Sequence, residues 1–264
     1  MKRPFLVNEA PSPRGHARAC AYGIHAVAAR LAVTPPPIDH LYVREDASPR
    51  VAALVSLAIA ARIAVSRVPP AMLGRLCASD QHQGVVAQVP AFQYAELSAI
   101  LEGDAPRLLV VDQLRDPQNL GALLRSAEAA GFGALILPKD GAVGVTASVE
   151  KAAAGAAMRV PVVRVVNIAR TLRELKAHAY WIVGLAAGAG ADLFDFVAPT
   201  RVALVLGGES GLRRLVQEQC DQLVSIPMAG ACESLNASVA GAVAMYALRH
   251  RPASAAGASR ERKA

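Results

Sequence analysis

Hydrophobic positions form two kinds of run along this chain, and their alternation predicts its fold class. Short apolar runs such as 107–112 and 202–206 have the composition of strands buried on both faces. Between them lie longer segments whose apolar residues recur at helical spacing. Strands that alternate with helices favour a mainly parallel sheet covered by helices on both faces. The sequence therefore predicts an α/β fold.

The predicted elements fall into two groups. A small α/β domain over residues 19–96 has helices at 23–31, 51–61 and 70–77 and strands at 38–43, 62–68 and 83–89. A linker at 97–106 leads to a larger domain at 107–252, between disordered basic ends at 1–18 and 253–264. Its strands are predicted at 107–112, 134–137, 160–165, 181–185, 202–206 and 223–226, and its helices at 119–130, 145–155, 168–177, 212–219 and after residue 236.

Composition and charge narrow the class of protein. The formal net charge is +7, and basic residues gather at both ends, which favours a polyanionic partner such as RNA or simply solubilises the ends. No uncharged apolar run reaches the roughly 18 residues of a membrane span, and the N-terminus has no apolar signal region. Four scattered cysteines and no histidine cluster predict no metal site. We expect a cytoplasmic protein without a membrane partner.

Three loops follow predicted strands of the larger domain, at 113–119, 207–211 and 228–236. In open parallel sheets, ligands bind beyond the carboxyl ends of the strands, so these loops are the candidate site. Gly207 and Gly208 favour close approach of a ligand to the backbone. The loops match neither the G-x-G-x-x-G dinucleotide fingerprint nor a Walker A loop.

The polar residues of these loops also have ordinary structural explanations. Arg125 lies in an otherwise apolar helix, where an arginine is usually a surface residue and less often a phosphate ligand. Glu209 fits an exposed loop acid as well as a site residue. Ser234 and Asn236 precede a helical run that includes Val239 and Tyr246, where N-cap residues belong. Each loop taken singly is therefore weak evidence for a site.

Taken together, the three loops resemble the motifs of one enzyme family. DPQNLGALLRSAEAAG, LVLGGESGLR and SIPMAGACESLNASVA resemble, in this order, the three motifs of the SpoU/TrmH family. Its members are SPOUT-class RNA ribose 2′-O-methyltransferases that use S-adenosylmethionine. The segments GIHAV and HQGVVA resemble those of one branch, the bacterial 23S rRNA guanosine-2′-O-methyltransferases. The resemblance implies an N-terminal RNA-binding domain like ribosomal protein L30e, a C-terminal trefoil knot and a homodimer.

The resemblance also implies the site residues. In the family, the arginine of the first motif is proposed to help take the proton from the ribose 2′-hydroxyl. A free arginine side chain has a pKa above about 12, so an electrostatic and positioning role is easier to defend than a titrating base. The implied catalytic positions are Asn119, Arg125, Glu209, Ser234 and Asn236, and the implied cofactor-binding positions are Leu206, Gly207, Gly208, Ile226, Met228 and Leu235.

The motifs also depart from the family pattern in three places. The segment GGESGLR is one residue shorter than usual, with Ser210 where glycine is common, which affects the placement of Glu209. Glu233 and Ala153 stand where relatives carry a small residue and a serine, respectively. All five polar positions are kept, so we expect an active enzyme. Three alternatives stay open: the same chemistry on tRNA, a silent RNA-binding or ribosome-assembly factor, and a nucleotide-binding α/β protein of another kind.

Overall fold

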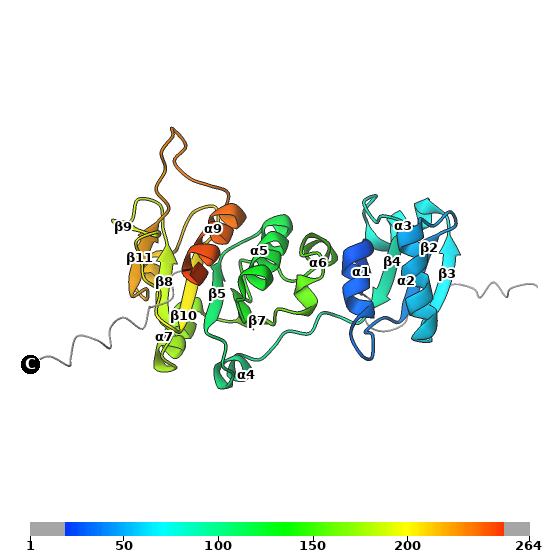
Figure 1. Cartoon of the computed structure of the whole chain (residues 1–264), viewed down its shortest axis with the longest axis horizontal. Helices are drawn as coiled ribbons and strands as arrows, with labels where there is room; N and C mark the ends of the chain where they lie inside the picture. Colours follow the sequence, from blue (N-terminus) through cyan, green and yellow to red (C-terminus); the bar gives the residue numbers. More distant parts are fainter. Residues whose placement is uncertain (1–18, 251–264) are drawn as a thin grey trace, which may run out of the picture.

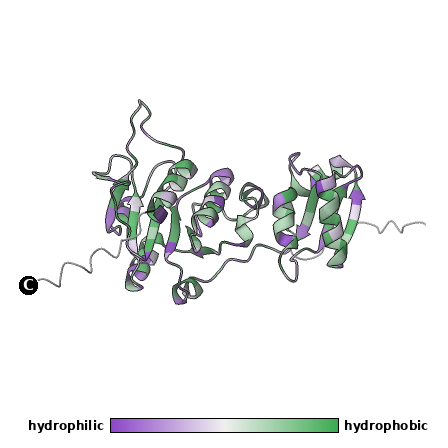
Figure 2. Ribbon diagram, viewed as in Figure 1, coloured by the Kyte–Doolittle hydropathy of each residue, from purple (hydrophilic) through white to green (hydrophobic). Residues whose placement is uncertain are grey.

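The computed structural model describes residues 19–250, which form two α/β domains joined by an extended segment (Figure 1). The basic ends predicted at 1–18 and 253–264 lie outside the described residues. Hydrophobic residues concentrate along the strands and the inward faces of the helices, as Figure 2 shows. Within residues 19–250, no helix is long and apolar enough to cross a membrane.

The first domain is built on a four-stranded sheet with the order β1-β4-β2-β3. Strand β4 is antiparallel to β1 and β2, whereas β2 and β3 are parallel. Helices α1 and α2 cover one face of this sheet and α3 covers the other. The bounds are β1 (Ala19–Tyr22), α1 (Ile24–Leu31), β2 (His40–Arg44), α2 (Pro49–Ala60), β3 (Ala64–Val68), α3 (Pro70–Cys77) and β4 (Val85–Val89).

The larger domain holds a seven-stranded sheet with the order β7-β6-β5-β10-β8-β11-β9, and every pair of neighbours is parallel. This confirms the predicted parallel sheet. Residues of β5 alternate between two core clusters on opposite faces, as expected for a strand buried on both sides. The strands are β5 (Arg107–Asp112), β6 (Ala134–Pro138), β7 (Val162–Val165), β8 (Trp181–Leu185), β9 (Ala191–Asp192), β10 (Val202–Gly207) and β11 (Gln222–Ser225).

Helices cover both faces of the larger sheet. Helices α5, α6, α9 and the short 3₁₀ helix η1 pack on one face, and α4, α7 and α8 pack on the other. Helix α9 lies beside α5 (Figure 1). The two helices pack closely at Gly241, where a Cβ would come within 2.4 Å of the Leu123 side chain. The helices are α4 (Leu97–Glu102), α5 (Pro117–Ala130), α6 (Ala147–Ala152), η1 (Ala156–Met158), α7 (Ile168–Ala177), α8 (Arg214–Gln217) and α9 (Ala237–His250).

Several helix ends differ from the sequence prediction for local reasons. Helix α5 begins at Pro117, two residues before the predicted start at Asn119, because Asp116 accepts a hydrogen bond from the N–H of Gln118 at 2.9 Å. Helix α6 is shorter than predicted, since Ala154 and Gly155 both adopt positive φ and end it. Helix α8 is likewise shorter than the predicted 212–219.

Four elements were not expected from the pattern: β1, β9, α4 and the 3₁₀ helix η1. Strand β1 and the two-residue strand β9 form through their pairing with β4 and β11. Helix α4 lies inside the predicted linker at 97–106. Its Leu101 is buried in the core cluster of the larger domain, and Leu97 and Ile100 pack against that cluster. The first half of the predicted linker therefore packs as part of the larger domain.

Helix α6 joins the two domains through a buried ion pair. Arg30 of α1 donates from Nε to Oε2 of Glu150 at 2.9 Å and from Nη2 to Oε1 at 2.7 Å. Both side chains are buried. Beside this pair, Lys151 donates to the side-chain oxygen of Gln81 at 2.8 Å. Removing one partner of a buried ion pair leaves an uncompensated charge, so this contact fixes α1 against α6.

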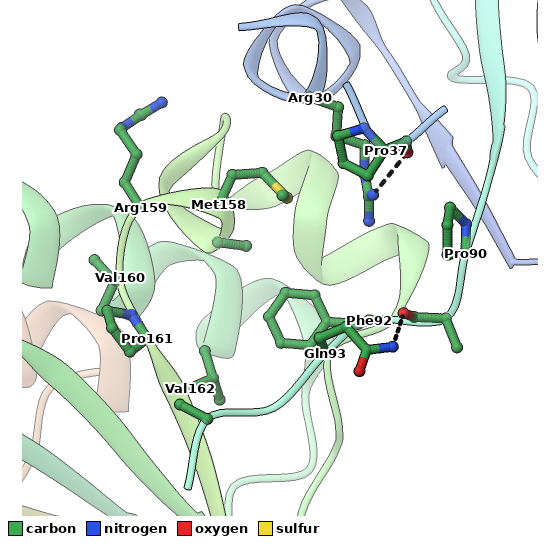
Figure 3. A pocket seen from close by; sticks show the side chains of 13 residues that line it. Arg30, Pro37, Pro90, Phe92, Gln93, Met158, Arg159, Val160, Pro161 and Val162 are labelled. Atoms are coloured by element: carbon green, nitrogen blue, oxygen red, sulfur yellow. Dashed lines mark hydrogen bonds between the residues drawn. The ribbon is translucent and has the colours of Figure 1, made fainter. Parts of the chain in front are cut away.

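A cavity of about 380 Å³ lies at the domain junction (Figure 3). Phe92 of the connecting segment and Met158 of η1 give it a largely apolar lining. At its edge, Arg30 also donates to the carbonyl of Pro37 at 3.3 Å. None of the predicted site residues lines this cavity, so it is separate from the candidate site.

Candidate active site

The three motif loops leave the carboxyl edge of the larger sheet. Strand β10 lies between β5 and β8, and β11 pairs with β8 on the far side. The loops after β5, β10 and β11 therefore leave the same edge. The loop between β11 and α9 extends furthest from the sheet before the chain returns to α9 (Figure 1). The fold thus brings the three sequence motifs to one edge, as predicted.

The first motif places its two polar residues on different sides of α5. Asn119 is 9% exposed, whereas Arg125 is exposed. Six residues of an α-helix correspond to roughly 9 Å along its axis and to a large rotation around it. The structure therefore does not pair these two side chains. Within residues 19–250, Arg125 forms no ion pair, so its guanidinium is available to a ligand.

The second motif forms a closed turn against the end of β5. A Cβ at Gly207 would lie 2.2 Å from the carbonyl carbon of Gly211, and one at Gly208 would lie 2.4 Å from the carbonyl oxygen of Gln113. The predicted reason for these glycines, approach of a ligand, is therefore not needed to explain them: the chain's own backbone occupies that space. Glu209 and Ser210 are exposed at the tip of the turn.

A buried aspartate that the sequence pattern did not indicate anchors this turn. Asp112, fully buried at the end of β5, accepts from Nε of Arg213 at 2.9 Å and from Nη2 at 2.6 Å. The hydrogen bond to Asp112 raises the pKa of the Arg213 guanidinium. An acid that ends a buried strand requires a partner, which is the signal that could have identified this pair. The pair fixes the chain that leaves the turn to the end of β5.

The third motif forms an open loop. Met228 is 37% exposed and Leu235 is 39% exposed, and Ser234 is exposed without a hydrogen bond to the described residues. No backbone N–H of 228–235 donates a hydrogen bond within the part of the chain that the structure describes. Asn236 accepts from the N–H groups of Ser238 at 2.9 Å and Val239 at 3.4 Å, which confirms the predicted N-cap of α9.

The loops share an edge, but the side chains do not form a preassembled catalytic group. Within residues 19–250, no hydrogen bond or ion pair joins any two of the five predicted catalytic residues, and no group of three or more His, Cys, Asp or Glu could hold a metal ion. Leu206 is buried under α9 and Ile226 packs partly against the same core. The candidate site therefore combines an apolar base packed in the core, at Leu206 and Ile226, with exposed side chains that a substrate can contact.

Helix α9 also shows which of its residues face the core. The buried positions are Gly241, Ala244, Met245 and Leu248. Val239 and Tyr246, which indicated the helix in the sequence, are 49% and 42% exposed. The periodicity therefore identified the helix correctly but included apolar residues that the described chain leaves uncovered.

Comparisons with known proteins match both domains. The model of the SpoU rRNA methylase family matches residues 106–246, and that of the RNA 2′-O ribose methyltransferase substrate-binding domain matches residues 20–95. The chain is 47% identical over 239 residues to the 23S rRNA (guanosine-2′-O-)-methyltransferase RlmB of Ralstonia nicotianae, covering 87% of this chain and 94% of that protein. It is 43% identical over 241 residues to RlmB of Salmonella typhimurium, covering 87% and 98%.

Solved structures resemble the whole two-domain arrangement. The SpoU methyltransferase AviRb from Streptomyces viridochromogenes, in complex with AdoMet, is 26% identical with a TM-score of 0.72, covering 88% of this chain and 90% of that one. An RNA 2′-O ribose methyltransferase is also 26% identical, with a TM-score of 0.74 and coverage of 89% and 88%. With its motifs on one sheet edge and relatives that match it across both domains, this chain belongs to the SpoU rRNA methylase family.

Proposed function

We propose that this chain is an S-adenosylmethionine-dependent RNA ribose 2′-O-methyltransferase that methylates a guanosine in 23S rRNA. The observation that carries the proposal is the similarity to 23S rRNA (guanosine-2′-O-)-methyltransferases across both domains at 47% identity. The placement of all three motif loops at one sheet edge supports it. In this assignment the domain at 19–96 binds RNA and the domain at 107–252, with helix α4 packed against it, performs the transfer.

The loops at the carboxyl edge fit an amphipathic nucleoside cofactor. The third loop offers two exposed apolar side chains, Met228 and Leu235, together with backbone N–H groups that make no hydrogen bond among the described residues. Apolar surface beside free donors suits the adenine and polar groups of S-adenosylmethionine. That cofactor supplies an electrophilic methyl group on a sulfonium. The residues that we assign to it are Leu206, Gly207, Gly208, Ile226, Met228 and Leu235.

Arg125 is the residue to which we assign the main electrostatic role. A ribose hydroxyl is a very weak acid, so its attack requires loss of the proton and stabilisation of the developing charge. The exposed guanidinium of Arg125, which has no ion-pair partner within residues 19–250, can hold a phosphate or the reacting oxygen. Asn119, Glu209, Ser234 and Asn236 then orient the RNA and shape the site.

A homodimer would cover apolar surface that the described chain leaves open. Val239 and Tyr246 lie exposed on α9, next to the exposed loop that contains Met228 and Leu235. A row of uncovered apolar residues beside a site is typical of an interface. The oligomeric state in solution, measured by light scattering, tests this part of the proposal, and the trefoil knot implied by the resemblance stays a prediction beside it.

Methyl transfer from labelled S-adenosylmethionine tests the activity and the substrate together. Unmodified 23S rRNA and unmodified tRNA are offered side by side, and incorporation of label is measured. Label on 23S rRNA supports the proposal, and label on tRNA alone keeps the chemistry but replaces the substrate. Cofactor binding without label on either RNA would favour a silent RNA-binding factor, the alternative suggested by the shortened Glu209 loop.

A further inference from the structure

A cleft between the two domains brings a residue of the first domain close to the first motif. The cleft has a volume of about 440 Å³, within the range of about 300–1,000 Å³ that is usual for ligand sites. It is enclosed by the N-terminal turn of α1 on one side and by α5 on the other. Its lining residues are His25, Arg125, Glu128, Ala129, Ala154 and Arg159.

The charges in this cleft favour an anion. Glu128 accepts hydrogen bonds from Nε and, at 2.9 Å, from Nη2 of Arg159, so both carboxylate oxygens are engaged. The hydrogen bond from Arg159 holds the pKa of Glu128 below its usual value, which keeps this carboxylate ionised beside its partner. Arg125 has no carboxylate partner within residues 19–250. One arginine therefore remains uncompensated.

His25 adds a hydrogen-bonding group from the opposite domain. Its side chain is exposed and forms no hydrogen bond or ion pair with the described residues. An imidazole and a guanidinium that face one small cleft suit a phosphate, which offers several acceptor oxygens. A cationic ligand would be repelled by Arg125, and the described residues of the cleft would offer it no unpaired carboxylate.

The fold holds the two sides of the cleft in place. A Cβ at Gly155 would lie 2.7 Å from Cβ of Ala29 and 3.4 Å from the carbonyl oxygen of His25, so α1 packs directly on the turn between α6 and η1. The buried ion pair between Arg30 of α1 and Glu150 of α6 holds the same two segments together. Rigid packing behind a binding group reduces the entropic cost of binding. His25 is therefore presented to the cleft by the packing of the two domains.

We propose that His25 and Arg125 together bind one backbone phosphate of the RNA substrate, so that the first domain contributes directly to the methyl-transfer site. The proposal rests on the proposed RNA methyltransferase function and extends it to a residue outside the three motifs. His25 acts as a binding residue here, and it takes no part in the chemistry.

Coupling between two substitutions tests this shared contact. The dissociation constant for unmodified 23S rRNA transcript is measured for His25→Gln, Arg125→Gln and the double variant. A hydrogen bond to a charged group is worth roughly 1.5–3 kcal/mol, so each single change should weaken binding about tenfold or more. If both residues hold one phosphate, the double variant should bind little worse than the weaker single variant. His178→Gln changes an exposed histidine at the C-cap of α7; it is the control and should bind like the wild type.

The outcomes separate this inference from the proposed function. The shared phosphate contact would be contradicted if the two fold-losses in RNA affinity simply multiply in the double variant. It would also be contradicted if His25→Gln binds RNA normally. Arg125→Lys provides a second test, because lysine keeps the positive charge. The non-additivity between Arg125→Lys and His25→Gln should be smaller than that between Arg125→Gln and His25→Gln, but it should not vanish. Methyl transfer by the wild type is measured in the same preparation. Its absence contradicts the proposed function, whereas the binding coupling is measured independently of turnover.

Discussion

The second and third motif loops leave the same sheet edge, yet they are built in opposite ways. The loop at 207–211 is closed on itself, with glycines pressed against backbone and its exit held by the Asp112–Arg213 pair. The loop at 228–235 is exposed, and its backbone N–H groups donate no hydrogen bond to the described residues. The chain's own backbone therefore completes the closed loop, whereas the N–H groups of the open loop find no partner among the described residues.

The largest effect should come from opening the closed loop. In Gly207→Ala the new Cβ would meet the backbone of Gly211 at 2.2 Å, so the turn must shift. Overpacking of this kind costs about 1–3 kcal/mol, and a clash with backbone belongs at the upper end. Thermal unfolding should show a clearly lower Tm, and calorimetry should show loss of S-adenosylmethionine binding.

The third loop provides the matched control for that change. A Cβ at Gly230 would meet nothing within 4 Å, so Gly230→Ala should leave the free energy of unfolding within about 0.5 kcal/mol of the wild type. Equal destabilisation by both substitutions would contradict the contrast between the loops.

Breaking the ion pair that anchors the closed loop should lower the free energy of unfolding by a smaller amount. Asp112→Asn keeps the shape of the side chain but removes the charge that holds Arg213. Arg213 is half exposed and water can solvate it, so we expect a loss of about 1–2 kcal/mol, below the 3–5 kcal/mol of a fully buried pair. Denaturant unfolding measures this loss. Glu218→Gln, which breaks an exposed pair with Arg214, is the control and should change stability by less than about 0.5 kcal/mol.

A substitution in the open loop should weaken cofactor binding and hardly change the free energy of unfolding. Leu235 is 39% exposed, so Leu235→Ala should change the free energy of unfolding by less than about 0.5 kcal/mol. If its side chain covers the cofactor, S-adenosylmethionine should bind several-fold more weakly, because burial of a leucine contributes about 1.5–3 kcal/mol when complete. A stability loss with unchanged cofactor affinity would show that the loop packs on the protein instead.

The sequence predicted most of the fold because its strands are buried on both faces and its helices are amphipathic. Strand β5, helix α7 and strand β8 begin and end at the predicted residues. The pattern could not reveal β1, which exists only through its pairing with β4, or α4, whose leucines need the larger domain to pack against. Long-range contacts decide such short elements, and local periodicity does not record them.

The arrangement of the three motif loops was also predictable from the sequence. The predicted parallel sheet placed the three loops on one edge, and the N-cap role of Asn236 followed from its position before an apolar run. The Asp112–Arg213 pair and the position of His25 opposite Arg125 were not predicted. Their residues are far apart in the chain, and only the folded arrangement brings them together.

The most direct test of the account is to map the methylated nucleotide. Unmodified 23S rRNA is incubated with S-adenosylmethionine and the wild type, Arg125→Ala or Arg173→Ala, an exposed arginine on α7 that serves as the control. Sequencing sensitive to 2′-O-methylation then reads every position. The proposed function predicts one modified guanosine with the wild type and with the control, and its loss with Arg125→Ala. Undiminished methylation by Arg125→Ala, or no methylated guanosine with the folded, cofactor-binding wild type, would contradict it.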